Sequence, residues 1–165
     1  MDGMSLVTKQ PEYPDADRTT CFEEGLEFQD LVADIFMKEL GISITSYSSR
    51  KYQWLKGENR QGIEIKLDTR ILETGNVSIE VAEKRAASVN IWTPSGIMRP
   101  DPSWLYVQGN KSIIFIFGKN ILQMVYLKQY LSKVWTPKPT IKTFRIPLSE
   151  ARRLALKVFE KFNSE

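Results

Sequence analysis

The chain has 165 residues, of which 42% are hydrophobic and 26% charged, and this suits one soluble domain with its own core. Its net charge of +3 permits a nucleic-acid partner without requiring one. There is no histidine, and Cys21 is the only cysteine. These absences exclude internal disulfides, Cys-rich zinc sites and every histidine-dependent triad or metal site. Chemistry near neutral pH would therefore depend on carboxylates, lysines and a hard metal ion.

Two stretches of sequence bear on where the protein works. Residues 1–17 are polar, contain two prolines and lack the apolar centre of a signal peptide. The longest apolar run, 113–117, is strand-sized and far short of the about 18 residues that a membrane span needs. We expect a cytoplasmic protein without membrane contact, with a flexible lead-in over 1–20 and a single domain over 21–165.

Hydrophobic periodicity in the first half predicts one helix followed by two strands. The helix covers about 22–40, with Gly41 as a stop signal. Residues 42–54 are ambiguous, and a short strand followed by a helical turn would fit them. Residues 61–68 and 77–84 each alternate between apolar and polar side chains, and Thr74-Gly75-Asn76 between them is a reversal signal. We therefore predict an antiparallel hairpin over 62–84.

The second half predicts a long loop, a further strand pair and two more helices. The loop covers 85–103, and strands 104–108 and 112–117 follow, joined by a Gly109-Asn110 turn. The uniformly apolar second strand should be central and covered on both faces. A helix over 120–134, a Pro-rich connection over 136–139, a strand over 141–146 and a final helix from Ser149 to about 162 complete the chain. The order is typical of an α/β fold with a central mixed sheet of four to five strands flanked by helices.

The polar face of the predicted hairpin gathers three carboxylates and two lysines. Glu64, Lys66 and Asp68 lie on one strand, and Glu80 and Lys84 lie on the other. With the turn near 74–75, Asp68 falls opposite or almost opposite Glu80, at about 4.5–5.5 Å between Cα atoms. Close carboxylates repel each other unless a cation lies between them. We therefore predict a Mg²⁺ or Mn²⁺ site with Asp68, Glu80 and Glu64 as ligands. An ordinary solvent-facing sheet surface is the alternative.

Such a site suits the hydrolysis of a phosphodiester bond. A bound metal ion lowers the pKa of its water and neutralises charge on the phosphate. A nearby lysine can position that water or stabilise the transition state.

The arrangement resembles the PD-(D/E)XK nuclease superfamily. That family has a helix bearing an acid, a strand ending in Asp, and a second strand bearing (Asp/Glu)-x-Lys. Here the corresponding parts are the helix over 22–40, the strand ending in Asp68, and Glu80-Val81-Ala82. The resemblance covers about 22–146 and implies a restriction-endonuclease-like fold, metal-dependent cleavage of DNA and a helix acid, for which Glu27 is the preferred candidate. The hairpin sequence also resembles small predicted nucleases of phages and mobile elements.

The sequence departs from the family pattern at Ala82, where a lysine is expected. Lys66 could place its ammonium in the space that alanine leaves, or Lys84 could reach back if a β-bulge shortens the path. A third interpretation is an inactive site. A fourth takes Glu64-Ile65-Lys66 as the (Asp/Glu)-x-Lys element; we rank it lower because its upstream acid, Glu58, is too close in sequence.

Basic residues on both sides of the hairpin are candidates for phosphate contacts. They are Arg50, Lys51, Arg85 and Arg99. Gln53 and Ser95 could also lie near the site. The leading hypothesis is a DNA endonuclease, and a homodimer would suit cleavage of both strands. The alternatives are a non-catalytic nuclease-fold module for nucleic-acid binding or assembly, and a homo-oligomeric structural protein.

Overall fold

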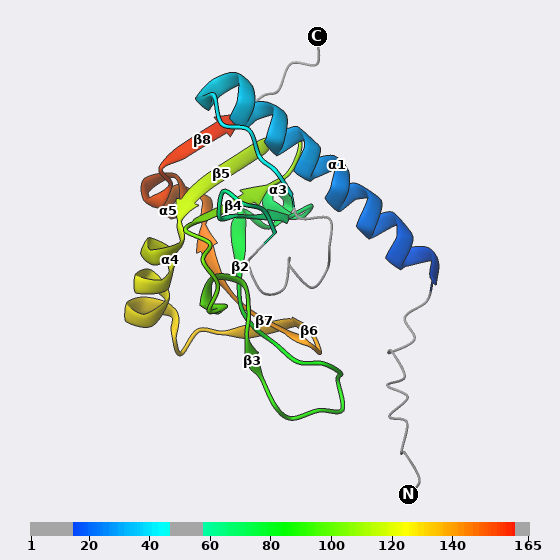
Figure 1. Cartoon of the computed structure of the whole chain (residues 1–165). Helices are drawn as coiled ribbons and strands as arrows, with labels where there is room; N and C mark the ends of the chain where they lie inside the picture. Colours follow the sequence, from blue (N-terminus) through cyan, green and yellow to red (C-terminus); the bar gives the residue numbers. More distant parts are fainter. Residues whose placement is uncertain (1–14, 47–57, 161–165) are drawn as a thin grey trace, which may run out of the picture.

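A computed structural model of the chain describes residues 15–46 and 58–160. The described residues form an α/β structure with two four-stranded sheets (Figure 1). The elements in chain order are α1 (Asp15–Leu40), β1 (Ile63–Leu67), α3 (Ile71–Thr74), β2 (Asn76–Glu83), β3 (Thr93–Pro94), the 3₁₀ turn η1 (Gly96–Met98), β4 (Leu105–Gly109), β5 (Ile113–Gly118), α4 (Lys119–Val125), the π-helical turn η2 (Tyr126–Tyr130), β6 (Trp135–Lys138), β7 (Ile141–Pro147), α5 (Leu148–Leu154) and β8 (Lys157–Glu160).

The first sheet is mixed and the second is antiparallel. The first has the strand order β1-β4-β5-β8, with β1 parallel to β4 and the other pairs antiparallel. All of β5 is buried, as its apolar sequence predicts for a central strand. The second sheet has the order β3-β2-β7-β6. Its β2–β7 register shifts between Glu80 and Ala82, which marks a β-bulge in β2.

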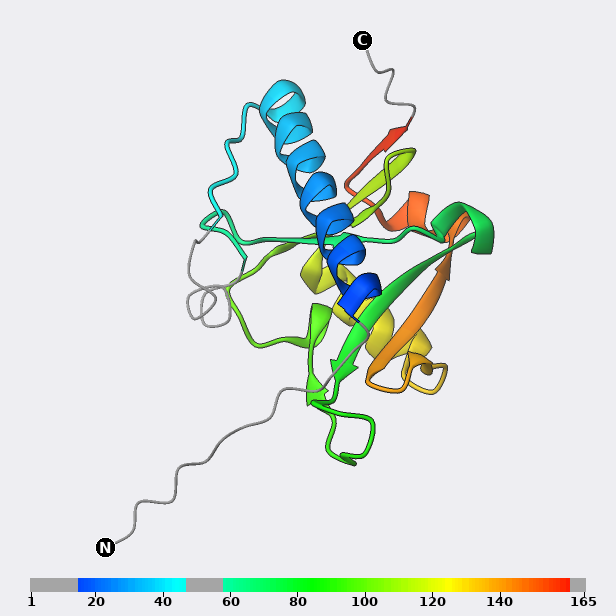
Figure 2. The same ribbon diagram turned by 90° about the vertical axis from the view of Figure 1, so that its right-hand side faces the viewer.

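Two hydrophobic clusters hold the structure in layers, with α1 across the first sheet (Figure 2). The cluster under α1 joins Phe28, Val32, Ile35 and Phe36 to Ile63, Ile65, Leu105, Val107, Ile114 and Ile116. The second cluster joins Tyr106, Phe115 and Phe117 to Val77, Ile79, Val81, Phe144, Ile146, Leu122 and other residues. Because side chains alternate along a strand, Glu64 and Lys66 leave β1 on the face away from α1.

Most predicted elements of the chain are confirmed, with shifted ends. The strands over 63–67, 76–83, 105–109, 113–118 and 141–147 lie where alternation and turn signals predict them. The first helix ends at Leu40, and Gly41 follows with a φ of 66°. The helix begins at Asp15, earlier than the predicted start near 22, while 1–14 lie outside the described residues. Of the ambiguous stretch, 47–54 also lie outside them, and 42–46 contain one isolated bridge, from Ser46 to Asn59.

The predicted hairpin is wrong, because its two strands belong to different sheets. β1 pairs with β4, whereas β2 pairs with β7 and β3. The short helix α3 lies between them, and Gly75 ends it in the left-handed conformation with a φ of 64°. The sequence Thr74-Gly75-Asn76 is therefore a helix C-cap rather than a hairpin turn. Both structures favour Gly at a positive φ, so local sequence does not separate them.

The predicted end of the chain also needs correction. The Pro-rich stretch 136–139 contributes to β6, which pairs with β7. The last helix stops at Leu154, and 157–160 form β8 at the edge of the first sheet. The loop over 85–103 contains β3 and η1, and the helix predicted over 120–134 divides into α4 and η2. As a result, two sheets replace the single central sheet. Among the described helices, none combines the length and the apolar character of a membrane span.

Candidate functional site

Glu64, Lys66 and Glu58 meet on the face of β1 that points away from α1. The Lys66 ammonium lies 3.2 Å from Glu64 Oε1 and 3.9 Å from Glu58 Oε1. Glu58 is fixed from its other oxygen, because Oε2 accepts the backbone N–H of Ile65 at 3.1 Å. The side chain of Glu64 is 3% exposed and that of Lys66 is 31% exposed. The Lys66 side chain therefore extends from the buried Glu64 carboxylate to the protein surface.

The carboxylate of Glu64 has unused hydrogen-bonding capacity. Both of its oxygens are buried, and neither accepts a hydrogen bond from any described residue. Its electrostatic partner is the Lys66 ammonium, at ion-pair distance. Buried polar atoms in folded proteins are almost always hydrogen-bonded, so a buried carboxylate with an ion-pair partner but no hydrogen bond needs an explanation. A ligand that completes the pairing is one such explanation.

Glu80 on β2 belongs to the same electrostatic group. Its Oε1 accepts the hydroxyl of Ser95 at 2.5 Å, and Ser95 is fully buried. Gly96 makes this approach possible, since a Cβ at position 96 would lie 2.3 Å from the Glu80 carbonyl oxygen. Gly96 also has a φ of 51°, which favours glycine. Ser95 thus holds Glu80, in agreement with its predicted place near the site. We call Glu58, Glu64, Lys66 and Glu80 the carboxylate–lysine cluster.

Burial and neighbouring charges shift the pKa values of Lys66 and Glu58. Burial alone would lower the pKa of Lys66, but the carboxylates of Glu64, Glu58 and Glu80 outweigh it and leave that pKa raised. Burial raises the pKa of Glu58, and the Lys66 charge opposes this in part. Lys66 is consequently positively charged at neutral pH. Glu58, with its raised pKa, binds a proton more readily than an exposed glutamate does.

Tyr106 lies on β4, beside the carboxylate–lysine cluster. It lies opposite Glu64 in the β1–β4 register and is almost completely buried. Burial, and then the negative charges of Glu64 and Glu80, raise the pKa of its hydroxyl well above the usual value. The hydroxyl therefore stays protonated and neutral beside the carboxylates. Sequence reasoning did not find Tyr106, because its contact with Glu64 depends on the pairing of two strands far apart in the chain.

Asp68 accepts hydrogen bonds from two backbone N–H groups and one side-chain amide. Its Oδ2 accepts the Ser78 backbone N–H at 3.3 Å and the Gln108 side-chain amide at 3.1 Å. Its Oδ1 accepts the Arg70 backbone N–H at 3.2 Å. The predicted opposition of Asp68 and Glu80 does not form, because the residue opposite Glu80 is Thr143 of β7. The structure thus gives Asp68 a structural role in connecting β1, β2 and β4.

Replacing Asp68 should therefore cost stability. In Asp68→Ala, the Ser78 N–H loses its Asp68 acceptor and the buried Gln108 amide loses one of its two acceptors, and we expect unfolding to become easier by about 1–3 kcal/mol. Urea unfolding followed by circular dichroism measures this loss. Arg70→Ala removes an exposed ion pair with Glu73 and should leave the midpoint unchanged. A midpoint for Asp68→Ala equal to that of the wild type would contradict the structural role.

The structure does not bring two of the predicted catalytic residues to the cluster. Glu27 lies on α1, exposed and 2.7 Å from the Lys111 ammonium, whereas the cluster is on the other face of the sheet. The bulge that would help Lys84 is present in β2. Lys84 nevertheless donates to the Ala87 carbonyl at 3.1 Å and lies over the Trp92 ring. Lys66 is therefore the lysine of this site.

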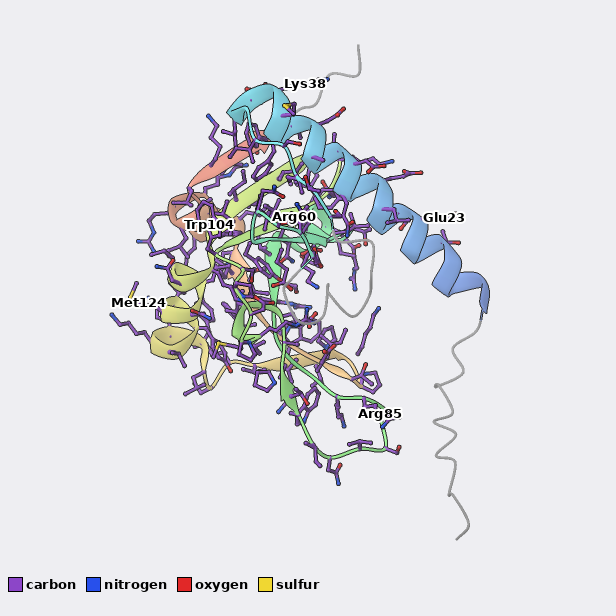
Figure 3. The ribbon with its side chains drawn as sticks, in the orientation of Figure 1. Glu23, Lys38, Arg60, Arg85, Trp104 and Met124 are labelled. Atoms are coloured by element: carbon purple, nitrogen blue, oxygen red, sulfur yellow. The ribbon has the colours of Figure 1, made fainter. Side chains whose placement is uncertain are left out.

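The predicted phosphate contacts are dispersed. Arg50 and Lys51, together with Gln53, lie outside the described residues. Arg85 is exposed on the loop after β2 (Figure 3). Arg99 lies 3.9 Å from Glu83, and its charge also acts on Glu58. Only Arg99 of these four is placed next to the cluster in the described part of the chain.

The approach of Glu58 to the cluster favours the lower-ranked interpretation of the motif. The short sequence separation between Glu58 and Glu64 argues against Glu64-Ile65-Lys66 as the (Asp/Glu)-x-Lys element. A tight turn resolves this, since Asn59 bonds both the carbonyl and the N–H of Ile63, at 2.6 and 3.0 Å. Gly62, with a φ of 71°, lets the chain reverse there. The turn lays Glu58 alongside β1, where its side chain reaches Lys66.

The acids present could hold a metal ion only with help from water or substrate. Among residues 15–46 and 58–160, no group of three or more acidic or cysteine side chains has the spacing of a metal site. Mg²⁺ is often bound by one or two carboxylates, with waters and substrate phosphates completing its shell. The Glu64 oxygens, which accept no hydrogen bond from the described residues, fit that smaller donor set, together with Glu80, whose charge also acts on Lys66.

No family model, curated protein or solved structure matches the chain significantly. The resemblance to PD-(D/E)XK nucleases therefore stays a prediction from its motifs.

Proposed function

We propose that this chain is a divalent-metal-dependent nuclease with a restriction-endonuclease-like fold, and that it acts as an endonuclease on DNA. One observation carries the proposal: the carboxylate of Glu64 is buried and accepts no hydrogen bond from the described residues, and it faces the Lys66 ammonium at 3.2 Å. Buried ionisable groups with shifted pKa values and a specific charge partner are often found at functional sites. The order acid-x-lysine on one strand, with a second acid on a neighbouring segment, supports phosphodiester hydrolysis.

Each member of the carboxylate–lysine cluster has a role in this proposal. Glu64 and Glu80 would hold Mg²⁺ or Mn²⁺, and the bound ion supplies an activated water and neutralises charge on the phosphate. Lys66 is a cation at neutral pH because its pKa is raised, so it stabilises developing negative charge rather than accepting a proton. The raised pKa of Glu58 suits it to accept a proton from the attacking water. Lys66 is then the lysine of the acid-x-lysine element Glu64-Ile65-Lys66.

The test of this assignment is Lys66→Ala. We expect cleavage of plasmid DNA with Mg²⁺ or Mn²⁺ in the wild type, no cleavage with EDTA, and a kcat about 100-fold lower in the variant because one stabilising cation is lost. Lys38→Ala, an exposed lysine at the end of α1, is the control and should keep the wild-type kcat. A larger loss of kcat for Lys84→Ala than for Lys66→Ala would contradict the assignment.

The second candidate is a nuclease-fold module that binds nucleic acid without cleaving it. Ala82 and the lack of a three-acid group among the described residues favour it. The same assay decides between the two, with duplex, single-stranded, branched and RNA substrates. Binding without metal-dependent cleavage of any of them would support the module and overturn the nuclease.

A further inference from the structure

Charge is unevenly distributed along the chain. Residues 84–149 contain ten lysines and arginines but one acid, Asp101. Asp101 is buried against Lys119, so its charge is neutralised inside the protein. Most protein surfaces mix both signs of charge, whereas a surface of one sign attracts ligands of the opposite sign. This segment thus adds cations to the surface without acids of its own, although Glu83 and Glu27 from outside it pair with Arg99 and Lys111.

Four of these cations gather at one end of the second sheet. Lys84 follows β2, and its backbone N–H donates to the Thr140 carbonyl at 2.9 Å. Lys142 is paired with Ala82, and Lys138 is paired with the first residue of β7. Arg85 is next to Lys84, on the loop at the bottom of the view in Figure 3. We call Lys84, Arg85, Lys138 and Lys142 the basic tip; none forms an ion pair with a described residue.

Trp92 organises two members of the basic tip. The ammonium of Lys142 lies 4.3 Å from the centre of its ring, and that of Lys84 lies 4.9 Å from it. The negative face of an aromatic ring attracts a cation in each such contact. Two positive groups on one ring also repel each other, and a bridging anion would remove that repulsion. The contacts restrict both lysines, which lowers the entropy cost of binding such an anion.

We propose that the basic tip binds the sugar-phosphate backbone of duplex DNA. The identity of the ligand rests on the proposed function, since a nuclease must hold a polyanion. Lys84 lies four positions after Glu80 along the chain, and at about 3.3 Å per residue this is about 13 Å, the length of about four base pairs. One duplex can then reach both the basic tip and the carboxylate–lysine cluster. The Trp92 ring contacts the ammonium groups of Lys84 and Lys142 and not a stacked base. This favours contact with the sugar-phosphate backbone of DNA over contact with its bases.

The test measures binding separately from cleavage. With EDTA present to prevent hydrolysis, a fluorescein-labelled duplex is titrated with the full chain at several salt concentrations. The double variant Lys84→Ala/Lys142→Ala should bind about tenfold more weakly or worse. Its slope of log K against log salt should fall by about 2, one unit for each lost phosphate contact. Lys38→Ala, at the opposite end of the molecule in Figure 3, should match the wild type.

The binding results test the basic tip independently of the proposed cleavage of DNA. Loss of DNA binding in the double variant supports the tip, and the tip then stands even if wild-type protein with Mg²⁺ cleaves nothing. Unchanged affinity and salt slope, in a double variant that melts like the wild type, overturns the tip even if cleavage is normal. Tip-dependent binding to anionic lipid vesicles without binding to DNA also overturns it, because the ligand would be a membrane surface.

Discussion

Glu64→Gln should reduce metal-dependent DNA cleavage at least about 100-fold while the protein stays folded. The substitution keeps the size of the side chain but removes the negative charge that would hold the metal ion and that pairs with Lys66. An amide also offers one oxygen where the carboxylate offers two. Calorimetric titration with Mn²⁺ in the absence of DNA should show weakened binding in the same variant, so ion binding and catalysis are measured independently.

Glu73→Gln is the matched control for this prediction. Glu73 is an exposed glutamate on α3, paired with Arg70 at 2.7 Å, and the charge change is identical. Cleavage and Mn²⁺ binding should match the wild type in this variant. Asp68→Asn tests the metal pair of Asp68 and Glu80 that the sequence predicts. If that pair holds the ion, this substitution must abolish cleavage. If Asp68→Asn is inactive while Glu64→Gln keeps full activity, the assignment of the site to Glu64 is wrong.

Local patterns in the sequence predict the strands well but not their neighbours. Alternation along 63–67 and 76–83 depends only on which face each side chain occupies, so it is visible in the sequence. Pairing depends on contacts between segments far apart, and the parallel β1–β4 pair joins strands about 40 residues apart. The short separation of β1 and β2 suggested a hairpin, and α3 between them prevents it.

The same distinction applies to the candidate site. Glu64 and Lys66 alternate with apolar residues along β1, and this pattern predicts that they share a face, as they do on the side away from α1. Glu80 alternates in the same way with the apolar residues of β2, which pack in the second cluster. Asp68 has the same pattern but caps backbone groups instead, since it follows the end of β1. The contact of Tyr106 with Glu64 follows from strand pairing. Local sequence patterns therefore could not predict this contact.

The largest expected loss of stability comes from Lys119, far from the cluster in sequence. Its ammonium donates to the Arg99 carbonyl at 2.9 Å and to Asp101 Oδ1 at 2.8 Å. It also donates to the Ser103 hydroxyl at 2.7 Å. Its side chain is 5% exposed and that of Asp101 is 4% exposed. A charge this deeply buried is tolerated only while it is paired and hydrogen-bonded.

Lys119→Ala should lower the free energy of unfolding by about 3–5 kcal/mol, because it leaves the Asp101 carboxylate buried without its cation. Thermal and urea unfolding measure this loss. Lys111→Ala is the matched control, since the Lys111–Glu27 pair has a similar distance of 2.7 Å but both side chains are exposed. It should unfold like the wild type, because water screens and replaces such a pair. Equal effects of the two substitutions would contradict the burial argument.

Lys119 also connects stability to the candidate site. It fixes the segment 99–103, which directly follows η1, and η1 follows the Ser95 that holds Glu80. A milder variant, Lys119→Arg, keeps the charge but cannot fit three donors to the same acceptors. It should loosen this segment while the protein remains folded, and cleavage should fall with it through the position of Glu80. A folded Lys119→Arg protein with wild-type kcat would show that the segment and the carboxylate–lysine cluster are independent.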